Sequence, residues 1–191
     1  APLSGGHGRR RITSDDGWLH FLHGVSPDGR NLAYVGIRQT TDAWPAGNLF
    51  TMSTEDGQVV QLTDDPFHDD APEYSPDGRF IYVNSERGNR TPGHAQLFRM
   101  GADGSGMTQL TFDERVNWFP HVSPNGQSMV YLSFPPGTLG HPSDTEVLIR
   151  ACAPGGTRTR DLVAALGGQG TINVPSWSPD SSHVAYVDID A

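Results

Sequence analysis

Short runs of alternating apolar and polar residues recur along this chain and predict β-strands. Four of these runs are rich in β-branched and aromatic residues, which favour extended backbone. They span residues 31–35, 80–83, 128–132 and 183–187. A shorter apolar stretch lies before each run and ends at Val25, Tyr74, Val122 or Trp177. A tight turn separates the two stretches each time, so each turn is predicted to join two antiparallel strands.

The connecting turn is a repeated motif. It reads Ser-Pro-Asp-Gly at 26–29 and 75–78, Ser-Pro-Asn-Gly at 123–126 and Ser-Pro-Asp-Ser at 178–181. Proline presets φ at the second position of a type I turn, Asp or Asn suits the third position, and Gly suits the fourth. The four prolines lie 49, 48 and 55 residues apart, and a period of this size is typical of repeat architectures.

Two further strands are expected in most repeats. The third strand is predicted at 48–53, 95–100 and 146–151, and the fourth at 59–63, 107–111 and 159–163. Four antiparallel strands in a unit of roughly 40–50 residues describe a propeller blade. A row of unrelated hairpins could give similar runs, but four copies in register favour the propeller. We expect an all-β propeller of four-stranded antiparallel blades with about four blades present, divided at 1–19, 20–67, 68–116, 117–171 and 172–191.

The first and last of these units are incomplete. Residues 8–13 are predicted to form a lone fourth strand, and the sequence stops after the first two strands of its last unit. Either the early strand closes the last blade of a small four-bladed ring, or the chain is part of a larger ring. Because folded proteins avoid open sheet edges, we expect these edges to be paired within a ring or through self-association.

The composition narrows the class of partner. The net charge of −9 and the pI near 5.2 argue against duplex nucleic acid as a partner. No apolar stretch approaches the roughly 18 residues of a membrane span. The single cysteine, Cys152, excludes an internal disulfide framework. A hydrophobic fraction of 35%, with 23 glycines and 15 prolines, suits a turn-dense all-β protein.

Several segments together resemble one family of propellers. They are Tyr74–Tyr82, Met107–Thr111, Asn117–His121 and Gly167–Pro175. On these segments the protein resembles the TolB-like family, whose repeats are called PD40 or WD40-like repeats, and in particular its short stand-alone bacterial members. The resemblance covers nearly the whole chain and implies a six-bladed ring, of which about two blades would be missing on the N-terminal side. Most such members have no assigned activity. The compartment stays open, with a periplasmic or secreted location favoured over a cytoplasmic one.

Candidate functional residues gather in the segments that lead into the innermost strands. In a propeller these segments open onto one mouth of the central channel, where ligand sites are usually found. His68 and Ser176 lie in these segments as well. The predicted ligand-binding residues are His20, His23, Asp69, Asp70, Glu73, Asn117, Trp118, His121 and Asn173.

Three interpretations of this set remain open. The residues could cap strands around a water-filled channel. They could line a pocket for a protein segment, peptide or sugar, with Trp118 as the stacking surface. They could also hold a divalent metal such as Zn, Mn, Fe or Ca through His23, Glu73 and His121. Pectate-fragment lyases built on related propellers use a histidine-ligated metal, which supports the third interpretation only by analogy.

Offsets from the repeated proline place these residues relative to one another. Glu73 and His121 share the same offset, so they are predicted to occupy equivalent places in adjacent blades and to share a mouth. His23 is one residue out of step, so it should point to the other strand face unless a bulge intervenes. Gly24 then takes the equivalent place and is predicted to open room near the pocket. His141, in a long connection, is interpreted as a surface residue.

Known catalytic motifs are missing from the sequence. Residues 24–29 only approximate a nucleophile elbow, and there is no His-Glu-x-x-His, phosphate loop or dinucleotide fingerprint. Whether the protein is an enzyme stays open. The favoured function is a binding or scaffolding module for a protein, peptide or sugar ligand. The alternative is a metal-dependent lyase or hydrolase that acts on a carbohydrate.

Overall fold

The computed structural model describes residues 11–13, 17–41, 45–88, 91–172 and 174–189. These residues form three four-stranded antiparallel sheets, as expected for propeller blades. Within these ranges there is no helix that could span a membrane. The strands are β1 (Trp18–Val25), β2 (Asn31–Arg38), β3 (Gly47–Ser53), β4 (Val59–Gln61), β5 (Asp69–Tyr74), β6 (Phe80–Ser85), β7 (Gln96–Gly101), β8 (Thr108–Gln109), β9 (Val116–Val122), β10 (Met129–Phe134), β11 (Thr145–Cys152) and β12 (Arg160–Gly167).

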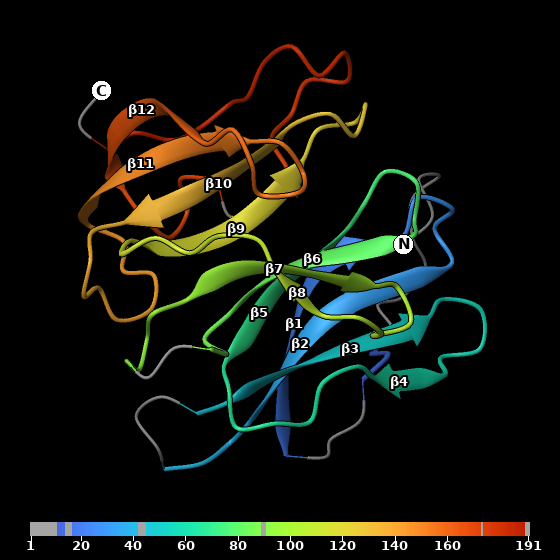
Figure 1. The fold of residues 1–191 in the computed structure, drawn as a ribbon. Helices are drawn as coiled ribbons and strands as arrows, with labels where there is room; N and C mark the ends of the chain where they lie inside the picture. Colours follow the sequence, from blue (N-terminus) through green and yellow to red (C-terminus); the bar gives the residue numbers. More distant parts are fainter. Residues whose placement is uncertain (1–10, 14–16, 42–44, 89–90, 173, 190–191) are drawn as a thin grey trace.

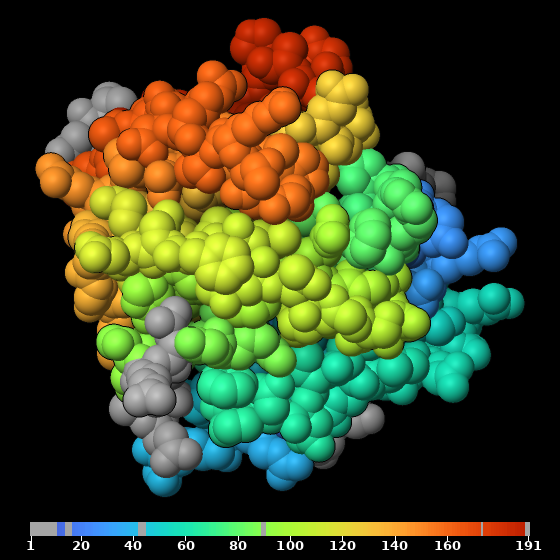
Figure 2. Space-filling model, viewed as in Figure 1, coloured from blue at the N-terminus to red at the C-terminus, as the bar shows by residue number. Residues whose placement is uncertain are grey.

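The three blades follow one another in space as they do in sequence. Each blade is a meander, so that strands adjacent in the sequence are also paired in the sheet. Figure 1 shows the blade of β1–β4 beside that of β5–β8, which in turn lies beside that of β9–β12. The space-filling view shows the same order as successive colour bands that touch along their length (Figure 2). The inner strands β1, β5 and β9 contact one another in turn, which places their ends around a common channel.

Side chains close the repeated turn, which explains its composition. In the first copy, Ser26 Oγ donates to Asp28 Oδ1 at 2.6 Å, and Asn31 N donates back to Ser26 Oγ at 2.9 Å. Gly29 N donates to Ser26 O at 2.8 Å, with φ of 72° at Gly29, in the left-handed region that glycine enters without strain. The second, third and fourth copies repeat these side-chain bonds.

A second repeated motif, Gln-Leu-Thr at 61–63 and 109–111, ends the outer strand of the first two blades. In each copy the threonine hydroxyl accepts the hydrogen bond that a backbone carbonyl would accept in a regular ladder. Thr63 Oγ1 accepts from Leu49 N at 2.9 Å, and Thr111 Oγ1 accepts from Leu97 N at 2.9 Å. The observed β4 and β8 are therefore shorter than the predicted strands at 59–63 and 107–111.

The hydrophobic core lies between blades. Ala33 and Leu49 of the first blade pack against Ile81 and Phe98 of the second. The far face of the second blade packs against Met129 and Tyr131 of the third in the same way. Adjacent blades thus bury apolar faces against each other.

The last predicted unit differs from the expectation. Residues 183–187 do not form a strand, and a single antiparallel bridge joins Trp177 to Val184. The backbone bonds of this segment go elsewhere: Val187 N donates to Thr171 O at 3.1 Å and Ile189 N to Leu166 O at 3.0 Å. No third strand lies beside it in the described residues, so a regular ladder does not form there. The predicted strand at 8–13 falls mostly outside the described residues, and its described part, 11–13, is not a strand.

Candidate functional site

A β-bulge occurs at the same place in all three inner strands. The register shifts between Leu22 and Gly24 in β1, between Asp70 and Glu73 in β5, and between Trp118 and His121 in β9. A bulge bends its strand and changes the direction of the side chains beside it. The bulge on which the predicted direction of His23 depended is therefore present, and it changes which side chains face the channel.

A pocket of about 630 Å³ opens where these strands begin. We call it the channel-mouth pocket. One side is apolar and accessible, since Phe21 is 47% and Leu22 60% exposed. The other side is imidazole-rich, because four of the eight histidines of the protein line it. The lining residues are His20, Phe21, Leu22, His23, Ile37, Pro45, His68, Asp70, Phe119, His141 and Gln169.

Asp70 connects the first two blades at the base of this pocket. Its Oδ1 lies 3.1 Å from Nε2 of His23, and its Oδ2 lies 3.8 Å from Nε2 of His68. Burial alone would raise the pKa of Asp70, but the hydrogen bonds and charges of His23 and His68 hold it well below its usual range. The carboxylate is therefore ionised and already paired on both oxygens.

His68 lies between Asp70 and the backbone of Pro45. Its Nδ1 lies 2.9 Å from the carbonyl oxygen of Pro45, and a carbonyl can only accept, so Nδ1 carries a proton. Burial alone would lower the pKa of His68, but Asp70 beside Nε2 outweighs it and raises the pKa. Asp70 thereby favours the imidazolium form of His68.

His141 forms the roof of the pocket. Its ring centroid lies 4.5 Å from that of Trp118 and 5.3 Å from that of Phe119, both in edge-on contact. Burial lowers the pKa of His141, which favours a neutral ring at pH 7. The interpretation of His141 as a surface residue was wrong, because the loop between β10 and β11 folds back over the channel mouth and half-buries the ring. No spacing in the sequence signals this fold-back.

Glu73 and His121 lie together, as their equal offsets predicted, but they do not line the channel-mouth pocket. Glu73 Oε2 is 2.5 Å from His121 Nδ1, and Glu73 Oε1 accepts from Val122 N at 3.1 Å. The other ring nitrogen of His121 bonds the carbonyl of Ile172. Both nitrogens of His121 are thus occupied, and the pair ties the second blade to the third.

The three residues predicted to hold a metal are divided between these two groups. His23 pairs with Asp70, whereas Glu73 pairs with His121. Among the described residues, no group of three or more His, Cys, Asp or Glu is placed to hold a metal ion. The metal site stays a prediction that this geometry does not support.

The remaining predicted residues have structural surroundings. Asp69 is buried against Arg87, whose Nη2 is 2.5 Å from its Oδ2. Asn117 is buried in hydrogen bonds to neighbouring side chains of its own and the preceding blade. Trp118 is fully buried, so a ligand cannot stack on it here, and Phe119, which lines the pocket, is itself only 2% exposed. Asn173 lies outside the described residues.

Gly24 does not open room near the pocket, contrary to the expectation. A Cβ built on Gly24 would lie 2.6 Å from the carbonyl oxygen of Pro72 and 3.3 Å from Cα of Glu73. The backbone of the second blade occupies that space. The missing side chain therefore serves close packing of blade on blade.

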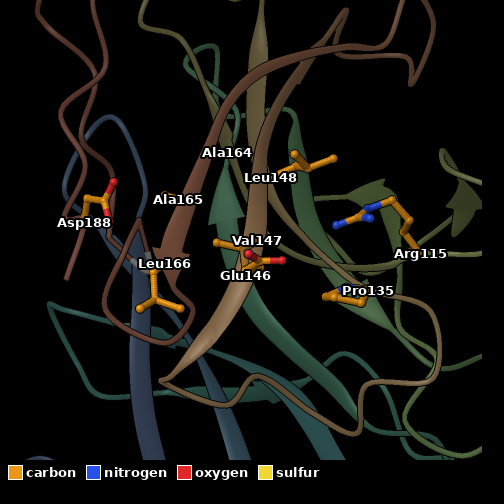
Figure 3. A pocket seen from close by; sticks show the side chains of 9 residues that line it. All are labelled: Arg115, Pro135, Glu146, Val147, Leu148, Ala164, Ala165, Leu166 and Asp188. Atoms are coloured by element: carbon orange, nitrogen blue, oxygen red, sulfur yellow. The ribbon is translucent and has the colours of Figure 1, made fainter. Parts of the chain in front are cut away.

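A second hollow of about 480 Å³ lies on the third blade, away from the predicted site residues. Arg115 and Glu146 extend their charged ends toward it, and Leu166 and Asp188 border its other side (Figure 3). The guanidinium of Arg115 is already engaged, since its Nε donates to Ser133 Oγ at 2.9 Å and its Nη2 to Ser133 O at 2.6 Å. The channel-mouth pocket is therefore the stronger candidate.

Comparison with known proteins gives a consistent result. The PD40 family, described as the TolB beta propeller domain, matches residues 7–141. An uncharacterized protein of Agrobacterium fabrum is 38% identical over 167 residues, which are 87% of this chain and 54% of that protein. A TolB-like protein from Agrobacterium tumefaciens has a structure with a TM-score of 0.82 at 36% identity, over 92% of this chain and 59% of that one.

More distant structures share the fold. An oligogalacturonate lyase in complex with manganese matches with a TM-score of 0.63 at 16% identity, over 88% of this chain and 47% of the lyase. Identity this low shows the shared fold and no more.

The sequence spans only 54% and 59% of the lengths of the two Agrobacterium proteins described above.

Proposed function

This protein belongs to the TolB β-propeller family, and we propose that it is a binding module whose channel-mouth pocket receives a peptide segment of a partner protein. The observation that carries the proposal is the composition of this pocket. Accessible apolar side chains, Phe21 and Leu22, lie opposite imidazole groups in this pocket. Its volume of about 630 Å³ is within the usual range of ligand sites, roughly 300–1,000 Å³. A peptide can match both parts of this pocket, because its apolar side chains can pack on Phe21 and Leu22 while its polar groups bind the imidazoles.

The chemistry of the pocket favours binding over catalysis. The lining residues in the described part of the protein include no serine, threonine, cysteine or lysine that could act as a nucleophile. Asp70, its carboxylate, is already paired by His23 and His68. Aliphatic Leu22 and Ile37 beside Phe21 suit apolar peptide side chains, and the buried position of Trp118 removes it as a stacking surface for a sugar.

The test is selection of peptides followed by measurement on matched variants. A random dodecapeptide phage library is panned against the full-length protein, and the selected peptides are synthesised and titrated by calorimetry. Leu22→Asn removes an apolar pocket side chain that is 60% exposed, and Leu162→Asn removes one of 40% exposure on β12, outside the pocket lining. Fully burying a leucine side chain contributes roughly 1.5–3 kcal/mol. A peptide that covers the exposed part of Leu22 would gain a fraction of this free energy, so loss of the side chain should weaken binding by about tenfold.

We expect Leu22→Asn to weaken the selected peptides about tenfold, while Leu162→Asn leaves them unchanged. Peptides that bind both variants equally would show that binding occurs elsewhere. Failure to select any peptide whose binding depends on Leu22 would refute the proposed function.

A further inference from the structure

The channel-mouth pocket offers imidazole nitrogens that nothing in the described residues uses. Nε2 of His23 faces Asp70 at 3.1 Å, but its Nδ1 has no partner among the described residues. His141 contacts Trp118 and Phe119 through its ring. One ring nitrogen bonds the backbone of His141 itself, and neither nitrogen is hydrogen-bonded to another residue in the described part of the protein. Two imidazoles from different blades thus line one cavity with unused nitrogens.

Among the described residues that line the pocket, Asp70 carries the one carboxylate, and its oxygens are already engaged. Oδ1 of Asp70 accepts from Ala71 N at 2.6 Å and lies 3.1 Å from His23, while Oδ2 lies 3.8 Å from His68. A cationic ligand would have to displace these partners from a buried carboxylate, which is costly. An anionic ligand would instead meet nitrogens that already line the cavity.

We propose that the channel-mouth pocket recognises a carboxylate carried on an apolar body, with His23 and His141 binding the carboxylate and Phe21 and Leu22 contacting the body. This inference rests on the proposed function and specifies which feature of the peptide is read. The carboxylate can come from the C-terminus of a polypeptide or from an Asp or Glu side chain next to an apolar residue, since both present the same two oxygens.

Recognition of this kind depends on pH. The described titratable groups that face the cavity are His20 and His23 from β1, His68 from the segment before β5, Asp70 from β5, and His141 from the loop between β10 and β11. Burial lowers the pKa of His141, so the ring is neutral at pH 7, and a carboxylate placed beside it favours its charged form. Nε2 of His23 donates to Asp70, so its Nδ1 can donate to a carboxylate only in the imidazolium form. Binding should therefore require a proton on both nitrogens of His23, take up a proton at His141, and tighten as the pH falls.

The test compares a carboxylate with its amide. The full-length protein is titrated at pH 6 and pH 8 with N-acetyl-phenylalanine and with N-acetyl-phenylalaninamide, and binding is followed by backbone amide chemical shifts. A third probe, N-acetyl-Phe-Glu-amide, carries its carboxylate on a side chain and distinguishes the two sources. We expect the carboxylates to bind at least about tenfold more tightly than the amide at pH 6, with a smaller advantage at pH 8.

Variants at His141 separate charge recognition from packing. His141→Phe keeps a ring against Trp118 but removes both nitrogens, so it should lose most of the preference for acid over amide while still binding the probes. His141→Asn keeps an amide donor and should retain more of the preference, with a weaker pH dependence. His183→Phe changes an exposed histidine outside the pocket and should behave as the wild type.

The outcomes are distinct from those of the peptide selection. Equal affinity for acid and amide that still falls in Leu22→Asn would overturn carboxylate recognition and leave the proposed binding function standing. Absence of binding by all three probes, or an unchanged acid preference in His141→Phe, would also overturn the inference.

Discussion

Substituting Gly24 by alanine should destabilise the contact between the first two blades. The added Cβ would lie 2.6 Å from Pro72 O, 3.3 Å from Glu73 Cα and 3.4 Å from Ala33 Cβ. Because the nearest atom is a backbone carbonyl inside β5, the two blades must move apart to relieve the contact. Overpacking of this kind costs about 1–3 kcal/mol, while replacing glycine by alanine in a strand returns about 0.5–1 kcal/mol. The net loss in unfolding free energy should be roughly 1–2 kcal/mol.

Gly155 provides a matched control for this prediction. A Cβ at Gly155 would meet nothing within 4 Å, and neither glycine has a positive φ. For a protein of this size 1 kcal/mol corresponds to about 2–4 °C in Tm. Scanning calorimetry should therefore show Gly24→Ala melting about 2–8 °C below the wild type, with Gly155→Ala unchanged or slightly more stable. Equal melting temperatures for the two variants would refute the close approach of the blades at Gly24.

Two further substitutions and one labelling experiment test the structure. Asp70→Asn should lose about 2–4 kcal/mol at pH 7 in urea titrations; because its neighbours lower the folded-state pKa of Asp70, this stabilisation is complete above about pH 4 and is lost only as the pH falls through the folded-state value. Gly78→Val should cost at least about 1–2 kcal/mol by calorimetry, since φ is 72° there; an unchanged Tm would contradict the turn. Burial raises the pKa of Cys152 to about 12, so a thiol reagent should label it only after denaturation, and prompt labelling of the native protein would disprove its burial.

Much of the fold could be read from local sequence, because local chemistry builds its units. The Ser-Pro-Asp-Gly turns close through bonds between residues two to five positions apart, so each turn is specified by its own residues. The strands on either side follow from alternating apolar positions, and three of the four repeats form the expected sheets. The fourth forms only the bridge between Trp177 and Val184, and backbone N–H groups of that segment donate instead to Thr171 and Leu166.

The candidate site was predictable only in part. The equal offsets of Glu73 and His121 placed them together, because repeats in the same register put equivalent residues side by side. They could not show that Ile172 takes the second nitrogen of His121, since that contact depends on how the next segment packs. No pattern in the sequence indicated that Trp118 would be buried beneath His141.

The turns, most strands and the order of the blades follow from the amino-acid sequence alone, because they depend on residues close together in the chain. Which side chains share the channel mouth follows only from the folded arrangement. The bulges change the direction of the inner-strand side chains, the loop that carries His141 folds back over the mouth, and the blades approach within contact at Gly24. Each of these depends on packing between residues tens of positions apart, where small shifts in register and direction decide which atoms meet.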